Sequence, residues 1–546
     1  MDLISQLPNH ILHMLLDYHL PRKDAAQTSV LSKTWRAINY GSPFLYFDER
    51  DFMPKQKHSI TTLGDGVRED DSILLGDFNY GVVGNGVSIL HPRRQNLEEE
   101  EAASKKESHD LFMNYIESRI SSLLQHESTS PIEQFHLTFV NFDHQHDSSS
   151  LDLWLKHAFE RRVSNLILTV FTTLFDGQKE VVYSLPSSLF VSQTLTELKL
   201  ANCKLELLDG AAGNIKIKLP RLRDIHLSNL DLDDDFLKCL IVGCPLLGVM
   251  VLSYCLKLSN LQVTTLPRLE RVVVRACPNL ECLNIQSPEL QYFHFHGCHR
   301  GKTCNFRLIT SNVIKQMVLS MIRISGAWLQ RKIVKCEELI LIKASDFEDT
   351  KLSSQKLRYL TIHHCYVRKM VEIDCPNLYS LNYFENWLAA IHCVYPSELR
   401  RMIFQFSLED YRQHTSLPEK LKEYFGNVAM LGEVKAQMPK AKLTISSLDV
   451  EDLVDHFCAN SRNTPHQTLN IISTQKSNNK FSQVLYDELS RIKENANCCE
   501  DGINQCWRHK LSNVMKDSNV NDAPALLRFY QSKYYQISRI LLEREV

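Results

Sequence analysis

The sequence predicts an α/β protein in three parts: three short N-terminal helices, a curved solenoid built on a parallel sheet, and a mixed α/β segment at the C-terminus. Three observations lead to this expectation. Apolar residues recur every three to four positions over residues 1–50, which is typical of helices. A leucine-based template then recurs over residues 111–410. After about residue 411 the template stops, and strand-like and helix-like stretches follow.

The N-terminal helices are marked by prolines and by apolar stripes. Pro8 can open a helix because its missing N–H needs no partner in the first turn. Pro21 closes this helix and begins a second one, and a third helix places Leu31 and Trp35 on one face. A hairpin of this size cannot bury so much apolar surface by itself. We therefore expect residues 1–50 to dock on a partner.

Composition excludes several classes of function. The chain has 546 residues, enough for two or three domains, and a net charge of −2 with a pI near 6.9. This charge balance argues against nucleic acid as a main partner. The sequence has no apolar run long enough to suggest a membrane span. Because no secretory signal is visible, the 16 cysteines are expected to be reduced thiols, and the protein is expected in the nucleus and/or the cytoplasm.

Residues 51–110 have the composition of a linker or an exposed loop. Between Met53 and Lys106 the sequence loses its periodicity and gathers glycine. The acidic run Glu98–Glu101 is followed closely by Lys105, which is typical of a solvated segment. A helical apolar stripe then returns over Leu111–Leu124.

The repeat follows the template L-x-x-L-x-L-x-x-C/N, with other apolar residues in place of some leucines. From Leu247 onward its starts lie 21 to 24 residues apart, within the range of leucine-rich repeats, whereas earlier spacings are longer, as if loops were inserted. Half-copies at Leu258 and Leu280 predict that some repeats return through extended chain rather than through a helix. The main starts are Ile132, Val163, Leu195, Leu222, Leu247, Leu269, Leu290, Ile314, Cys336, Leu357, Leu378 and Leu399.

The template predicts which side chains each strand buries. Alternation along a strand sends the two leucines of x-L-x-L-x inward and the three x residues outward, onto the concave face. The terminal Cys or Asn supports the turn that leaves the strand. Each repeat buries its core only against its neighbours, which gives a solenoid with a parallel sheet. The turn position is held by Cys203, Cys255, Cys277, Cys298 and Cys365.

Residues 411–546 are expected to form a mixed cap over the exposed end of the sheet. The stretch KLTISSL has the pattern of a strand. The stretches SQVLYDELSRI and LLRFYQSKYYQISRILLE have helical periodicity.

A metal site or a catalytic centre is not expected. His294, His296, Cys298 and His299 lie close together in the sequence, but alternation places His294 and His296 on the concave surface and Cys298 at a turn. His363, His364 and Cys365 repeat this arrangement. The chain has neither of the glycine-rich phosphate-binding motifs.

The central outward position of the strands predicts an interaction surface. Half of its residues are aliphatic although they should face solvent, which usually marks a binding surface. Either the C-terminal cap folds over this row or a partner covers it; an error of register in the weaker copies is the third possibility. Tyr292, Tyr359 and Phe384 flank the row as aromatic anchors. The row consists of Lys199, His226, Val251, Val273, His294, Val318, Ile340, Thr361, Asn382 and Ile403.

The N-terminal segments LPNHIL, LPRKDAAQTSVLSKTWR and FLYFDE resemble the F-box in its plant form, with one departure at Thr34, where relatives usually carry a basic residue. CWRHKL at Cys506–Leu511 resembles a stretch near the C-termini of plant F-box/leucine-rich-repeat proteins. The resemblance implies an F-box over residues 1–50, a solenoid over 111–410 and a cap over 411–546. It also implies that a Skp-family adaptor binds Leu7, Pro8, Ile11, Leu12, Leu15, Leu20, Pro21, Ala25, Val30, Leu31 and Trp35.

The family resemblance further implies a substrate-recognition subunit of an SCF-type ubiquitin ligase. The adaptor would connect the chain to a cullin and a RING protein, and the repeats would hold an unknown target protein near the ubiquitin carrier. No cofactor is expected, and ubiquitin transfer would be performed by the partners. Two alternatives remain open, a small-molecule receptor of the same family and a non-degradative scaffold. The residues expected to contact the target are Val251, Val273, Tyr292, His294, Val318, Ile340, Tyr359 and Phe384.

Overall fold

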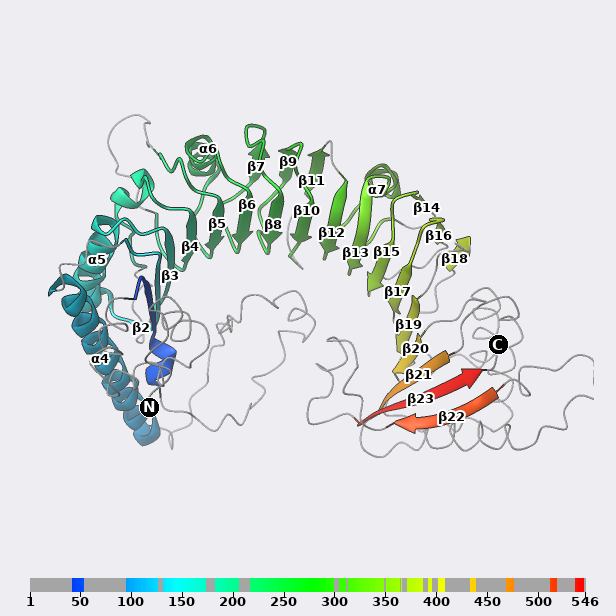
Figure 1. Ribbon diagram of the computed structural model, residues 1–546, viewed down its shortest axis with the longest axis horizontal. Helices are drawn as coiled ribbons and strands as arrows, with labels where there is room; N and C mark the ends of the chain where they lie inside the picture. Colours follow the sequence, from blue (N-terminus) through cyan, green and yellow to red (C-terminus); the bar gives the residue numbers. More distant parts are fainter. Residues whose placement is uncertain are drawn as a thin grey trace, which may run out of the picture. The chain divides into compact units, whose positions relative to one another are not determined.

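The computed structural model consists of two compact units, each built as a solenoid of stacked coils (Figure 1). The first unit comprises Met1–Glu270, Ala276–Pro288 and Cys304–Ile309, and the second comprises Arg271–Arg275, Glu289–Thr303 and Thr310–Val546. The three helices expected at the N-terminus lie outside the described residues. The structure describes residues 42–53, 95–125, 131–172, 182–205, 217–298, 304–310, 313–347, 350–363, 365, 371–385, 391–394, 401–407, 433–437, 468–475, 511–517 and 536–544.

The first unit is a parallel sheet with helices on its connections. Its main strands pair in chain order, and a second, three-stranded parallel sheet is formed by the returning segments. The main strands are β1 (Phe44–Asp48), β2 (Gln134–Phe142), β3 (Asn165–Thr172), β4 (Glu197–Ala201), β5 (Asp224–Ser228) and β6 (Val249–Ser253). The smaller sheet contains β7 (Asn260–Val263), β9 (Cys282–Gln286) and β11 (Asn305–Ile309). The helical elements are η3 (Glu49–Phe52), α4 (Gln95–Gln125), α5 (His144–Glu160), η5 (Ser187–Val191) and α6 (Asp234–Gly243).

The second unit repeats this arrangement and ends in antiparallel strands. Its main strands pair in parallel, each with the next along the chain. These strands are β8 (Arg271–Arg275), β10 (Tyr292–His296), β12 (Ile314–Ser320), β13 (Cys336–Ile342), β15 (Tyr359–His363), β17 (Ser380–Glu385), β19 (Arg401–Ser407), β20 (Glu433–Gln437) and β21 (Thr468–Gln475). β23 (Gln536–Arg544) then pairs antiparallel with both β21 and β22 (Leu511–Asp517). The returning segments include α7 (Gly326–Ile333) and the small sheet β14 (Lys351–Ser353), β16 (Val371–Asp374) and β18 (Ile391–Val394).

The leucine template specifies these coils, as the sequence predicts. Each repeat start lies at the first residue of a main strand or two residues before it. In β10, for example, Phe293 and Phe295 are buried while His294 and His296 are half-buried on the opposite face. The half-copies at Leu258 and Leu280 lead into β7 and β9. The expectation that some repeats return through extended chain is therefore confirmed.

The turn after each strand extends the hydrogen-bonded ladder by one residue. Asn202, Asn229 and Met321 adopt left-handed backbone conformations with φ of 56°, 50° and 51°. Their N–H groups donate to the last strand residue of the next coil, at 3.1, 2.9 and 2.8 Å. The following residue points inward: Cys203 is 1% exposed, and its thiol donates to the carbonyl of Ala201 at 3.2 Å. Leu230 and Ile322 are buried at the same position, so the turn requires an apolar, inward-pointing side chain, and cysteine is one residue that meets this requirement.

The expected linker over residues 51–110 is wrong at both of its ends. β1 already pairs with β2, and η3 follows it to Phe52, so the sheet begins inside the N-terminal segment. Helix α4 begins at Gln95 and contains the acidic run Glu98–Glu101. Glutamate and lysine are good helix formers, and Glu101 precedes Lys105 at the favourable i,i+4 spacing. Residues 54–94 lie outside the described residues.

The expected C-terminal helix over LLRFYQSKYYQISRILLE is also wrong over Gln536–Arg544. This segment is β23, which pairs with a strand on each of its edges. Hydrogen bonding to two distant strands outweighs the local helical periodicity, because strand formation depends mainly on such neighbours. KLTISSL and SQVLYDELSRI lie outside the described residues. Among the described helices, none combines the length and the apolar character that crossing a bilayer requires.

Candidate functional site

The outward face of the second unit carries three rows of side chains in strict register. In the first row, Arg271, Tyr292, Gln316, Glu338 and Tyr359 follow one another from β8 to β15. The central row contains the residues expected from the sequence, and the observed pairing confirms its register. This row contains Val273, His294, Val318, Ile340, Thr361, Asn382 and Ile403, and the first unit has Lys199, His226 and Val251 in the equivalent order.

The central row is not an exposed apolar strip, and that expectation is wrong for its valines. Val251, Val273 and Val318 are only 9%, 4% and 3% exposed. Strands in a sheet lie about 4.8 Å apart, so each side chain packs against its in-register neighbours. Val318 lies between His294 and Ile340, which are longer and only half-buried. The valines therefore support the surface, and the longer residues form it.

Aromatic rings and cations gather on and beside the first row. The Arg271 guanidinium carbon lies 4.6 Å from the centroid of the Tyr292 ring, and Lys315 Nζ lies 5.8 Å from it. At the other end of the row, Tyr359 packs edge-on against Tyr379, with ring centroids 5.9 Å apart. Both tyrosines predicted as anchors thus lie on the same row. The third predicted anchor, Phe384, is on β17 in the outer row, which also contains Arg275, His296, Ser320, Ile342 and His363.

A second cation, Arg358, completes the Tyr359 end of this row. Its guanidinium carbon lies 5.9 Å from the centroid of the Tyr359 ring, and one of its nitrogens lies 4.0 Å from Glu337. The two ends therefore have the same composition, an aromatic ring beside a cation, but among the described residues only the Arg358 cation forms an ion pair with a carboxylate. Arrangements of this kind bind partners through stacking and charge rather than through chemistry.

Hydrogen bonds link the middle of the surface across three strands. His294 Nε2 donates to Gln316 Oε1 at 2.6 Å, and Gln316 Nε2 donates to Glu338 Oε2 at 2.8 Å. Burial lowers the pKa of His294, and the positive charges of Arg271 and Arg275 act in the same direction, against the bond to Gln316. The imidazole is therefore neutral at neutral pH. It fixes the orientation of Gln316 and through it that of Glu338.

The histidines of β10 are held by neighbouring side chains. His296 Nδ1 lies 3.0 Å from Ser320 Oγ, and His294 is held by Gln316. Across the part of the chain that the structure describes, no three His, Cys, Asp or Glu side chains come close enough together to hold a metal ion. Cys298 is half-buried at its turn.

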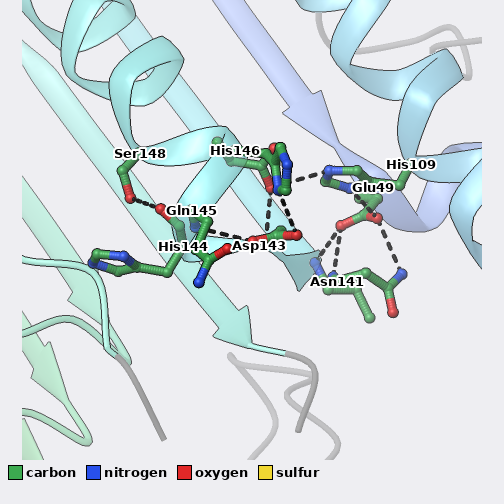
Figure 2. A network of polar contacts seen from close by, with 10 residues as sticks. Glu49, His109, Asn141, Asp143, His144, Gln145, His146 and Ser148 are labelled. Carbon is green, nitrogen blue, oxygen red and sulfur yellow. Dashed lines mark hydrogen bonds and ion pairs between the residues drawn. The ribbon is translucent and has the colours of Figure 1, made fainter. Parts of the chain in front are cut away.

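A second polar cluster lies in the first unit, where η3, α4 and α5 meet, and Figure 2 shows it. Glu49 is fully buried and accepts hydrogen bonds from Val140 N at 2.5 Å, Asn141 N at 2.9 Å and Asn141 Nδ2 at 3.0 Å. His109 Nδ1 donates to Glu49 Oε1 at 2.9 Å, and His109 Nε2 forms an ion pair with Asp147 Oδ2 at 3.0 Å. This cluster, which we call the Glu49–His109–Asp147 clasp, joins residues 60 positions apart and has no local signature in the sequence.

The clasp is charged and structural. Burial disfavours a charged imidazole, but the contacts with Asp147 and Glu49 outweigh it and raise the pKa of His109 to about 10. Burial also favours a neutral Glu49, yet the hydrogen bonds from His109 and two backbone N–H groups keep its pKa below the ordinary value. Because a carboxylate occupies each ring nitrogen, the imidazole has no free position for general-base chemistry. The clasp joins the helices α4 and α5 to the start of the sheet.

The predicted adaptor-binding residues, from Leu7 to Trp35, all lie outside the described residues. The structure therefore places the residues of the repeat surface and leaves the N-terminal prediction untested.

Comparison with known proteins gives one domain match and several relatives. Residues 123–315 match the domain family described as At1g61320/AtMIF1, LRR domain. The putative F-box/LRR-repeat protein At5g41840 of Arabidopsis thaliana is 28% identical over 255 residues, which cover 46% of this chain and 37% of the relative. The putative F-box/LRR-repeat protein At3g59170 of the same plant is 28% identical over 275 residues, covering 49% of this chain and 50% of the relative.

A third relative, the putative F-box/LRR-repeat protein At3g59160 of Arabidopsis thaliana, is 27% identical over 321 residues, covering 57% of this chain and 56% of the relative. The chain thus spans about half the length, or less, of the curated relatives it matches. The matched domain coincides with coils of the solenoid, from the end of α4 to the start of β12. The repeat geometry is that of a leucine-rich-repeat solenoid, and the sequence is similar to plant F-box/leucine-rich-repeat proteins.

Proposed function

We propose that this protein is a substrate-recognition subunit of an SCF-type ubiquitin ligase. Its F-box, within residues 1–50, would bind a Skp-family adaptor and through it a cullin and a RING protein. Its repeats would bind a target protein, which would then receive ubiquitin from the partners. The observation that carries the proposal is the outward face of β8 to β15, which presents Arg271, Tyr292 and Tyr359 on one in-register row, with Arg358 beside the Tyr359 ring.

The composition of this face supports binding rather than catalysis. The cations beside Tyr292 and Tyr359 contact aromatic rings, and His294 is engaged by Gln316. Tyrosine and arginine are the residues that most often dominate protein interfaces. In the proposed complex, Tyr292, His294, Ile340, Tyr359 and Phe384 contact the target, while the buried valines 251, 273 and 318 shape the surface beneath it.

The mechanism of such a subunit is proximity. Binding a target and an adaptor on one chain replaces a chance encounter with a local concentration set by the geometry of the complex. No group on this chain has to react, and the ubiquitin bond is made by the partners. We propose a location in the nucleus and/or the cytoplasm, where cysteines such as the buried Cys203 and Cys255 remain reduced.

Co-purification of the full chain with its partners tests this function. The wild-type chain should retain a Skp-family adaptor and a cullin, because the apolar residues of the helices that the sequence predicts over residues 1–50 exceed what so small a module can bury. The double variant Leu7→Ala/Pro8→Ala should lose both partners while its circular dichroism spectrum stays unchanged. Leu153→Ala is the matched control, since Leu153 is a 50% exposed leucine on α5 in the first unit.

Three outcomes separate the possible functions. Loss of both partners in the double variant alone supports the proposal. Retention of both by the folded double variant contradicts the F-box assignment. A wild-type chain that retains the adaptor without a cullin would instead be a non-degradative scaffold.

A further inference from the structure

Arg271, Tyr292 and Lys315, which we call the cation–aromatic site, form a positively charged end of the outward face of the second unit. We propose that this site binds an acidic side chain, aspartate or glutamate, of an extended segment of the target protein. The inference rests on the proposed function, because it assumes that this face receives a target. It adds the chemistry of the recognised segment and the order of its residues.

The first argument is charge without a counter-charge. Arg271 is half-buried and Lys315 is exposed, and both contact the Tyr292 ring. Among the described residues, neither forms an ion pair with a carboxylate. Lys351 in the same unit shows the usual arrangement, with Glu372 at 2.8 Å and Asp374 at 3.1 Å. Two cations held beside one ring therefore leave a local positive potential that a carboxylate would neutralise.

The second argument is the state of His294, which lies one row further along the same strand as Tyr292. Besides its burial, Arg271 and Arg275 hold the pKa of this imidazole below its ordinary value. The groups that face it are these two arginines and the amide of Gln316. These two arginines, on β8 beside β10, bring positive charge to the part of the surface where a target would lie.

The third argument limits how far an acidic segment can extend. Two strands beyond Tyr292, Glu338 lies in the same row and accepts a hydrogen bond from Gln316, and Glu337 precedes it on β13. A continuous polyanion such as a nucleic acid strand would meet these carboxylates. A peptide with one acidic residue at the cation–aromatic site and neutral residues after it would bring no negative charge near Glu337 and Glu338.

The spacing of the row then gives the order of the target residues. Tyr359 lies three strands beyond Tyr292, at β15. Three strand spacings are about 14 Å, which an extended peptide spans in about four residues. Because Tyr359 packs with Tyr379, its end of the row suits an apolar or aromatic side chain. The recognised segment thus has an acidic residue and an apolar residue about four positions apart.

A displayed library of random 12-residue peptides, panned against the full-length protein, tests this inference. Enriched peptides should carry Asp or Glu about four positions from an apolar residue. Binding of the most enriched peptide, followed by fluorescence polarisation, should weaken roughly tenfold in Arg271→Gln/Lys315→Gln, since two partly exposed ion pairs are lost. It should also weaken as salt is raised. Arg331→Gln/Lys356→Gln removes the same charge from exposed residues of this unit and should bind as the wild type does.

Several results would overturn the inference. These are enrichment of basic or purely apolar peptides, no enrichment at all, equal binding by the two double variants, or tighter binding of a labelled oligo-dT strand than of the peptides. If Arg271→Gln/Lys315→Gln fails to fold, replacing the peptide's acidic residue with its amide tests the same contact and should again weaken binding roughly tenfold. The proposed function is tested separately, because co-purification of the adaptor does not depend on the cation–aromatic site. Either proposal can therefore fail without the other.

Discussion

Replacing His109 with glutamine tests how much the Glu49–His109–Asp147 clasp stabilises the first unit. The chain provides its own control in His146. Both imidazoles have Nδ1 2.9 Å from a carboxylate oxygen, of Glu49 and of Asp143 respectively. The side chains of the first pair are 12% and 0% exposed, whereas those of the second are 77% and 44% exposed. Each substitution therefore removes an Nδ1–carboxylate contact of 2.9 Å, and His109→Gln also removes the contact of Nε2 with Asp147. Figure 2 shows both imidazoles.

The expected magnitudes follow from that difference. His109→Gln leaves two buried carboxylates, Glu49 and Asp147, without their cation, and breaking a buried ion pair costs about 3–5 kcal/mol. Glu49 keeps its hydrogen bonds from Val140 and Asn141, so we expect the lower end, about 3 kcal/mol. His146→Gln removes an exposed pair and should cost about 0–1 kcal/mol.

Denaturant unfolding at pH 7 measures both losses. Trp154 is a suitable reporter because it is buried in the first unit and stacks on Phe139, with ring centroids 6.5 Å apart. Its fluorescence and the far-ultraviolet circular dichroism should give the same order of midpoints: wild type and His146→Gln close together, His109→Gln well below. Equal losses in the two variants would refute the argument that burial gives the clasp its strength.

Three further predictions concern pH and packing. The pKa of His109 in the folded protein, about 10, exceeds its ordinary value of 6.5. The stabilisation by its charge is therefore complete below pH 6.5 and is lost as the pH rises through 10. In denaturant titrations, the difference in unfolding free energy between wild type and His109→Gln should be full at pH 6 and nearly closed at pH 10.5. Gly297→Ala should lower the melting temperature because the new Cβ would overlap Met321 O, whereas Gly248→Ala, with its nearest atom at 3.6 Å, should melt like the wild type. Val318→Glu should cost about 2–4 kcal/mol by thermal or chemical unfolding because this side chain is 3% exposed, and Val318→Ala should cost less; equal losses would mean that volume, not charge, is responsible.

The repeat could be predicted from the sequence because its signal is local and is copied many times. Each start, such as Leu269 or Leu290, fixes a strand within a few residues, and the register of the central row follows from the template alone. The half-copies at Leu258 and Leu280 likewise predict β7 and β9. Errors arose where the signal depends on distant partners. β23 has helical periodicity but is held by strands on both sides.

The start of the sheet was missed for a related reason. The stretch FLYFDE resembles part of the N-terminal module, yet Phe44–Asp48 pairs with β2 across a long intervening segment. The acidic run Glu98–Glu101 was interpreted by its charge, although its residues are also good helix formers.

The candidate site was predicted in part. Alternation correctly placed Tyr292 and His294 on the outward face, since a strand fixes which side each residue faces. It did not predict the burial of Val318, which depends on the size of the side chains on the neighbouring coils. Nor could it find the clasp, because Glu49 and His109 are 60 residues apart and neither carries a local signature.

Proximity labelling in plant cells, with and without proteasome inhibition, tests the central claim most directly. The claim is that one chain joins a ligase adaptor to a target bound on its repeats. We predict that the wild-type protein labels the adaptor, the cullin and a set of other proteins whose amounts rise when the proteasome is inhibited. Leu7→Ala/Pro8→Ala should label the same other proteins without the adaptor, and their amounts should no longer respond to the inhibitor. Adaptor labelling that persists in this variant, or wild-type neighbours that never respond to inhibition, would contradict the claim.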